Sequence, residues 1–368
     1  MSITKEINSC PQVNSSDNFL DSIESYLQEF IAPVAFDIDQ SPTALKKALQ
    51  GLIKLSLLSV RIPQSWGGLG LEPERFYLLQ QLLSQYSGAL AFLQLQHQGS
   101  INALVNSKNE PLKKQYLSKI VENNLLCGLG FSQLRREGKP MITATPIQGG
   151  YNIIGKVPWI TGFNFFDVFI LGANLPDGRE IRGIIPFTPS SQVRFSAPMK
   201  LGAMQSTNTV EAIFENYFLS SESVVSIAPA GAIHDNDKKV VLYPSFLVLG
   251  CAKAGLDIVK KAAEIKQISF IEKSYDILSK ELHDCQDKIR QKMQVDNRFF
   301  EDDLKLRVWA INLAQKCSKA ALIVSSGAAN YYNHPAQRVY KEALVFSVFT
   351  QTTDIMKASL EQLIIDSV

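Results

Sequence analysis

The spacing of apolar residues changes twice along the chain, and this limits the possible folds more than any other feature. In the first 124 or so residues, apolar side chains recur every three or four positions, as in SDNFLDSIESYLQEFI from Ser16. This spacing is typical of amphipathic helices. From Leu125 the apolar segments become short, rich in β-branched and aromatic residues, and separated by Gly, Pro and Asn, which indicates strands. Helical spacing returns after Asp235 in three long runs: residues 239 to about 293, 299 to about 330, and 335 to about 366.

This order predicts a mainly helical α+β protein in three domains. We expect an N-terminal helical domain (1–124), a central antiparallel β-sandwich or barrel (125–234) and a C-terminal helical bundle (235–368). Few folds place a sandwich between two helical domains, so the order itself is informative.

Composition excludes several function classes. Lys plus Arg number 37 against 35 Asp plus Glu, so the net charge of +2 creates no field that would attract nucleic acid or an anionic membrane. The start of the chain has no signal-peptide pattern, and the most apolar stretch, from Val240, is too short and interrupted to span a bilayer. We therefore expect a cytoplasmic protein. The five cysteines and four histidines are scattered, which predicts reduced core thiols and no metal site.

One stretch of the β-rich segment displays an aromatic ring beside a hydroxyl. GGYNIIGKVPWITG, from Gly149, ends in Trp159, Ile160 and Thr161. From the residues alone, Trp159 is either a core aromatic, with Thr161 on a strand surface, or part of a binding wall for a flat apolar ligand with polar atoms along one edge.

Over nearly its whole length the chain resembles the acyl-CoA dehydrogenase superfamily of flavoenzymes. Five stretches carry the resemblance through their order and spacing: RIPQSWGGLGLEPE from Arg61, NEPLKKQYLSKIVENNLLCGLGFS from Asn109, GYNIIGKVPWITG from Gly150, KLGAMQSTNTVEAIFENYFLSSESVV from Lys200, and NHPAQRVYKEALVFSVFTQTTDI from Asn333. The resemblance implies FAD between sandwich and bundle, an acyl thioester substrate on CoA or a carrier protein, and a homodimer or homotetramer joined through the bundle. It also implies which residues contact the flavin: Phe131, Ser132, Trp159, Ile160, Thr161 and Thr352.

The chain also departs from the family pattern. Thr350 stands where many members have the glutamate that removes the substrate α-proton, and Tyr243 lies near the other family location for this base. Neither side chain is acidic, so the catalytic residue is unknown. QLRREGKP, from Gln133, replaces a loop that holds flavin and thioester, and its two arginines either grip an anion or are solvated. The motifs that meet the dinucleotide are altered, which makes FMN or a loosely bound reduced flavin alternatives to FAD.

Three functions follow from these observations. The first is a flavin-dependent oxidoreductase acting on an acyl thioester through a relocated base. The second is a flavin-dependent monooxygenase of the same fold, which needs no α-proton base. The third is a non-catalytic protein that keeps the fold.

Overall fold

The computed structural model describes residues 19–296 and 298–365. Its first part is helical, as expected, and Cys10 and the predicted helix start at Ser16 lie outside the described residues. Ser41 begins a helix by accepting a hydrogen bond from the backbone N–H of Ala44, with Pro42 in the first turn. The helices that precede the sheet are α1 (Phe19–Tyr26), α2 (Ala35–Gln40), α3 (Pro42–Lys54), α4 (Pro73–Tyr86), α5 (Gly88–Val105) and α6 (Glu110–Val121).

The central part forms an eight-stranded sheet in the order β6-β7-β3-β2-β4-β5-β8, with β1 paired to β4. The strands are β1 (Cys127–Gly130), β2 (Ile142–Ile147), β3 (Gly150–Ile160), β4 (Val168–Asn174), β5 (Glu180–Pro186), β6 (Val193–Phe195), β7 (Val210–Ser220) and β8 (Val224–Ala228). Most neighbours are antiparallel, but β1 runs parallel to β4. The expected antiparallel β unit is present, and the parallel pairings of β1 and of β2 with β4 are details that the apolar pattern of a single strand does not encode.

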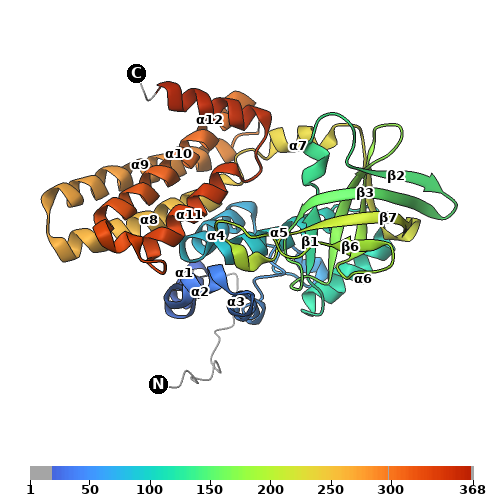
Figure 1. Cartoon of the computed structure of the whole chain (residues 1–368), viewed down its shortest axis with the longest axis horizontal. Helices are drawn as coiled ribbons and strands as arrows, with labels where there is room; N and C mark the ends of the chain where they lie inside the picture. Colours follow the sequence, from blue (N-terminus) through green and yellow to red (C-terminus); the bar gives the residue numbers. More distant parts are fainter. Residues whose placement is uncertain (1–18, 297, 366–368) are drawn as a thin grey trace.

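The last part is a helical bundle built around α8. Its members, with the short α7 before them, are α7 (Ala232–Lys239), α8 (Ser245–Lys266), α9 (Ser269–Met293), α10 (Phe300–Ser325), α11 (Pro335–Val348) and α12 (Thr353–Ile365). Close packing depends on small residues: a Cβ on Gly250 would lie 2.2 Å from the Gln81 carbonyl oxygen of α4. Figure 1 shows the sheet at one end of the molecule, α8 to α11 at the other, and α4 and α5 between them.

All three predicted helical runs are interrupted, the middle one at Ser326, which has φ of 53° at the start of the short 3-10 helix Ser326–Asn330. In the first run, α8 ends at Lys266. Gln267 then adopts a left-handed conformation with φ of 51° before α9 begins. The last is broken between α11 and α12 at Phe349–Thr352, where Thr350 has φ of 55°. The apolar pattern of the sequence did not reveal these breaks.

Candidate functional site

Two of the three segments assigned to the flavin lie side by side in the structure. The glycines of β1 allow close approach to the end of β3: a Cβ on Gly130 would lie 3.3 Å from Val157 Cγ1, and one on Gly128 would lie 3.4 Å from the Thr161 carbonyl oxygen. Any larger side chain at Gly128 would also collide with Phe166, at 2.7 Å. The glycines in CGLG therefore bring the ends of β1 and β3 together.

The residues at the end of β3 divide into an exposed ring, a core residue and a paired hydroxyl. Trp159 is 47% exposed, so its indole is not a core aromatic. Ile160 is fully buried and pairs with Val210 of β7, which leaves only its backbone available to a ligand. The Thr161 hydroxyl is buried and lies 3.0 Å from the Thr209 hydroxyl. Because one hydroxyl of such a pair donates and the other accepts, one hydroxyl proton remains free for a second acceptor.

After β1 the chain turns at Ser132, which begins a short 3-10 helix to Arg135. The Gln133 side chain holds this turn by donating to the carbonyl oxygens of Gly130 at 2.8 Å and Gly172 at 2.6 Å. The Ser132 hydroxyl oxygen is buried and has no hydrogen-bond partner among the described residues. Such a group is costly unless a ligand or water satisfies it.

Arg182 of β5 is a contact of this turn that sequence reasoning missed. Its guanidinium carbon lies 5.1 Å from the centre of the Phe131 ring. Burial lowers the pKa of Arg182, and Glu180, 3.8 Å away, opposes the shift. No motif marks Arg182, because its neighbours along β5 give no sign that Phe131 will pack beneath it.

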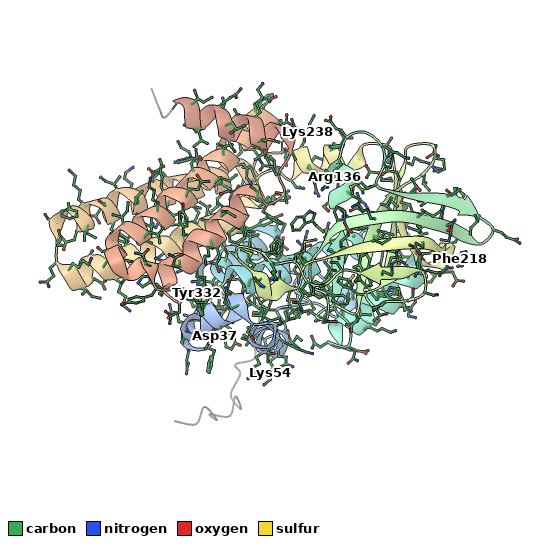
Figure 2. The ribbon with its side chains drawn as sticks, in the orientation of Figure 1. Asp37, Lys54, Arg136, Phe218, Lys238 and Tyr332 are labelled. Atoms are coloured by element: carbon green, nitrogen blue, oxygen red, sulfur yellow. The ribbon has the colours of Figure 1, made fainter. Side chains whose placement is uncertain are left out.

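The two adjacent arginines of the altered loop have different surroundings. Arg135 forms a bidentate ion pair with Asp237 of α7, through Nε at 2.6 Å and Nη2 at 2.8 Å. Arg136 is exposed, and Figure 2 shows it near Lys238 where the sheet meets α7. Arg135 is therefore committed to a protein partner, whereas Arg136 remains available to an anion.

The residues of the bundle that were considered for the site lie at helix ends. Thr352 precedes α12, and its hydroxyl accepts a hydrogen bond from the Ile355 N–H at 3.3 Å, so its own proton stays available. The Thr350 hydroxyl donates to the Phe349 carbonyl oxygen at 2.7 Å. Tyr243 stacks on Tyr77, with ring centres 4.7 Å apart.

The acidic residues near the predicted base position do not face a common site. Glu342 is fully buried, and its carboxylate accepts from Arg338 at 2.7 Å and from the Gly88 N–H at 3.0 Å. Burial raises the pKa of Glu342, and Arg338 opposes that shift. Asp354 lies exposed in the first turn of α12. Glu342 is thus the ion-pair partner of Arg338, which lies one helical turn earlier on α11.

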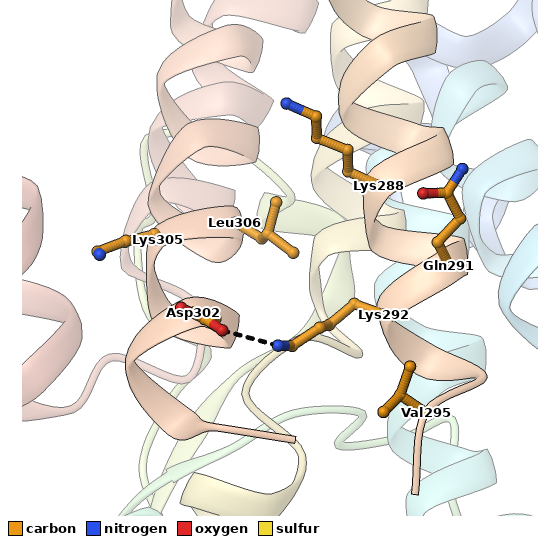
Figure 3. A pocket seen from close by; sticks show the side chains of 7 residues that line it. All are labelled: Lys288, Gln291, Lys292, Val295, Asp302, Lys305 and Leu306. Carbon is orange, nitrogen blue, oxygen red and sulfur yellow. Dashed lines mark hydrogen bonds and ion pairs between the residues drawn. The ribbon is translucent and has the colours of Figure 1, made fainter. Parts of the chain in front are cut away.

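Two cavities lie in the bundle, away from these residues. The larger, of about 430 Å³, lies between α9 and the start of α10 (Figure 3). Its lining residues are Lys288, Gln291, Lys292, Val295, Asp302, Lys305 and Leu306. An ion pair of 2.8 Å between Lys292 and Asp302 crosses it. The second, of about 320 Å³, lies between α9, α8 and the end of α10 and is lined mainly by apolar side chains.

No group of three or more His, Cys, Asp or Glu side chains in the described ranges is arranged to hold a metal ion. Among the same residues, no helix is both long and apolar enough to cross a membrane. Four cysteines, at 127, 251, 285 and 317, are buried free thiols.

Comparison with known proteins agrees with the architecture. Residues 14–124 match the model of the acyl-CoA dehydrogenase N-terminal domain. The mitochondrial 2-methylacyl-CoA dehydrogenase of Solanum tuberosum is 28% identical over 224 residues, which cover 58% of this chain and 54% of the relative. The matched part thus spans about half the length of the curated relative.

Solved structures extend the likeness to nearly the whole chain. Butyryl-CoA dehydrogenase from Megasphaera elsdenii superposes with a TM-score of 0.79 at 15% identity, covering 95% of this chain and 99% of that one. A glutaryl-CoA dehydrogenase from Mycobacterium smegmatis in complex with FADH2 has a TM-score of 0.79 at 13% identity, covering 93% and 92%. The N-terminal family match, the curated relative and the shared fold all support membership of the acyl-CoA dehydrogenase superfamily.

Proposed function

We propose that this chain is a flavin-dependent oxidoreductase that acts on an acyl-CoA thioester. The observation that carries the proposal is that the ends of β1 and β3, which lie close together, carry an unpartnered buried Ser132 hydroxyl and an exposed Trp159 indole. An apolar wall beside a few aimed hydroxyls is what a flavin ring requires.

The residues present fit a flavin ring. Trp159 would lie against the ring face, Ser132 and Thr161 would hydrogen-bond its polar edge, and Phe131 would support the turn that carries Ser132. Ile160 contributes its backbone, and Thr352 reaches from the bundle side. A flavin bound there supplies a two-electron acceptor for oxidation of the acyl group. FAD is our preferred form because the M. smegmatis relative is described with FADH2.

The residues at the two family base positions do not account for removal of the substrate α-proton. Thr350 and Tyr243 carry no carboxylate, so neither repeats the usual family base. This favours a second candidate, a flavin-dependent monooxygenase, because oxygen chemistry at the flavin needs no α-proton base. A non-catalytic role predicts that no flavin binds at all.

The outer side of the bundle supports self-association. α11 and α12 expose Leu344 (61%), Val348 (59%) and Leu360 (55%), and α10 exposes Ile323 (66%). Large apolar side chains exposed on several helices of a bundle are typical of a subunit interface. We propose a homodimer or homotetramer joined here.

The experiment is an absorption spectrum of the purified protein, followed by anaerobic addition of an acyl-CoA or the matching acyl carrier protein. Yellow protein that bleaches on adding a thioester supports the oxidoreductase, and the thioester that works identifies the carrier. Colourless protein that consumes oxygen only with supplied reduced flavin supports the monooxygenase. Protein that binds no flavin in either state contradicts both.

Point variants test the residues. Thr161→Val should weaken flavin binding by about 0.5–1.5 kcal/mol, as expected for one neutral hydrogen bond. Trp159→Ala should weaken it more, and Trp66→Ala is the matched control, since Trp66 lies in the turn before α4. Unchanged flavin affinity and an unchanged spectrum in both test variants would show that Trp159 and Thr161 have a purely structural role.

A further inference from the structure

A strained loop is bonded to the segment that carries Thr161. This loop, residues 203–209, leads into β7 and contains two non-glycine residues with a left-handed backbone, Met204 with φ of 54° and Asn208 with φ of 48°. Such conformations cost energy and persist only where the surrounding structure fixes them, often beside functional sites. The loop must therefore be held at both of its ends.

The second end of the loop is hydrogen-bonded to the chain just after β3. The Thr207 carbonyl oxygen accepts from the Gly162 N–H at 2.9 Å, and the Asn208 carbonyl oxygen accepts from the Phe163 N–H at 3.2 Å. The Asn208 side chain donates back to the Phe163 carbonyl oxygen at 3.1 Å. The loop and the segment after β3 therefore form one bonded unit.

This unit determines the surroundings of the Thr161 hydroxyl. Thr209, the last residue of the loop, places its hydroxyl 3.0 Å from that of Thr161, and both residues are buried. A hydroxyl hydrogen rotates to suit the partner that is present. The position of Thr209 therefore decides in which direction the Thr161 hydroxyl donates.

The first end of the loop is held by a buried carboxylate of α2. Asp39 is 2% exposed, and its Oδ1 accepts a hydrogen bond from the Met204 N–H at 2.7 Å. Gln40 donates to Oδ2 at 2.6 Å, so both carboxylate oxygens are held. Burial raises the pKa of Asp39, whereas its hydrogen bonds and the charges of Arg338 and Lys341 oppose that shift. Because hydrogen bonds to a carboxylate are stronger than neutral ones, Asp39 is a firm anchor for the loop.

The Met204 side chain is fixed as well. A Cβ on Gly88 would lie 2.8 Å from Met204 Cε and equally close to Glu342 Cδ. The Glu342 carboxylate also accepts from the Gly88 N–H at 3.0 Å. Met204 therefore lies where α2, the start of α5 and α11 meet.

A closed turn connects the two ends of the loop. Thr207 donates twice to the Met204 carbonyl oxygen, through Oγ1 at 2.8 Å and through its N–H at 3.1 Å. A displacement of Met204 is therefore passed to Thr207, whose carbonyl oxygen holds Gly162. Hydrogen bonds and this turn thus form a continuous path from Asp39 to the neighbour of Thr161.

We propose that Asp39 is a positioning residue for the flavin. It holds the loop so that Thr161 directs its hydroxyl at the polar edge of the ring, and it acts through Met204 and Thr209 rather than by touching the flavin. This inference rests on the proposed function, in which the Thr161 hydroxyl bonds the flavin.

The test is a double-mutant cycle on FAD affinity, measured by fluorescence titration of the full chain after removal of any bound flavin. Loss of one neutral hydrogen bond predicts that Thr161→Val weakens FAD binding by about 2- to 10-fold. Asp39→Ala should weaken it within the same range, because it acts through the same bond. Added to Thr161→Val, Asp39→Ala should cause no further loss, since two changes on one path are not additive.

Two further variants separate positioning from general stability. Asp37→Ala should leave FAD affinity unchanged, because Asp37 is exposed on the same helix (Figure 2). Asp39→Asn keeps an oxygen for the Met204 N–H and should lose less affinity than Asp39→Ala. If Asp39→Ala does not fold, Thr207→Val takes its place in the cycle, because it removes one of the two bonds that close the turn.

The outcomes distinguish this inference from the proposed function. Unchanged FAD affinity in the folded Asp39 or Thr207 variant overturns the inference alone. A loss that persists in full beside Thr161→Val does the same, because it shows that Asp39 acts by another path. Unchanged affinity in Thr161→Val removes the end of the path and also overturns it. A wild-type chain that binds no flavin overturns both proposals.

Discussion

His97 provides a quantitative test of the junction between the first helices and the sheet. It lies on α5, fully buried, and its Nδ1 accepts a hydrogen bond from the Cys127 N–H of β1 at 3.1 Å. The Ser100 hydroxyl donates to the Cys127 carbonyl oxygen at 2.8 Å. Burial lowers the pKa of His97 to about 4, against an ordinary value of 6.5. The ring is therefore neutral in the folded protein.

This pKa difference sets the direction and size of a pH effect. The unfolded chain takes up a proton at His97 below pH 6.5, whereas the folded chain resists it until about pH 4, so stability falls as pH falls between these values. Each unit is worth about 1.4 kcal/mol, which gives a total loss of roughly 3 kcal/mol, of which about 2 kcal/mol falls between pH 7 and pH 5. Above pH 6.5 the contribution is complete.

The assay is urea unfolding at pH 7 and pH 5 for the wild type and His97→Gln, with the exposed His283→Gln as control. Gln at position 97 does not titrate, so the pH-dependent loss should be about 2 kcal/mol smaller in that variant than in the other two proteins. Titrating carboxylates contribute equally to all three and cancel. Equal losses in His97→Gln and the wild type, or an NMR signal of His97 that titrates near 6.5, would refute the reasoning.

Three further perturbations test other parts of the structure. Glu342→Gln leaves Arg338 buried without its charge partner and should lower the free energy of unfolding by about 3–5 kcal/mol in urea, whereas Glu361→Gln, in an exposed pair, should cost below about 1 kcal/mol. Thr350→Gly should be more stable than Thr350→Ala by about 1 kcal/mol, the reverse of the order inside a helix, because position 350 has a left-handed backbone; calorimetry that ranks Ala above Gly contradicts this. Leu344→Lys should lower the mass measured by light scattering at micromolar concentration, and a wild type that is already monomeric rules out the bundle interface.

Local patterns in the sequence predicted much of the architecture. The change of spacing at Leu125 marks the start of the strands, and Ser41 and Pro73 mark helix starts that the structure reproduces. These features are local: side-chain period and capping depend on residues within a few positions of each other. The resemblance also directed attention to Trp159 and Ser132, whose exposure and unpartnered hydroxyl only the structure revealed.

Tertiary structure alone decided which distant residues meet. Arg135 pairs with Asp237 because α7 packs beside the turn that follows β1. The sequence held one weak indication that Arg307 is buried. Asp303 and Arg307 lie at helical spacing from Ala310 and Ala314, which are also buried. Spacing identifies a buried face, but it does not say what faces it. Partners in a folded chain are set by how whole elements pack, and this is why the lack of an ion-pair partner for the buried Arg307 among residues 19–296 and 298–365 became visible only in three dimensions.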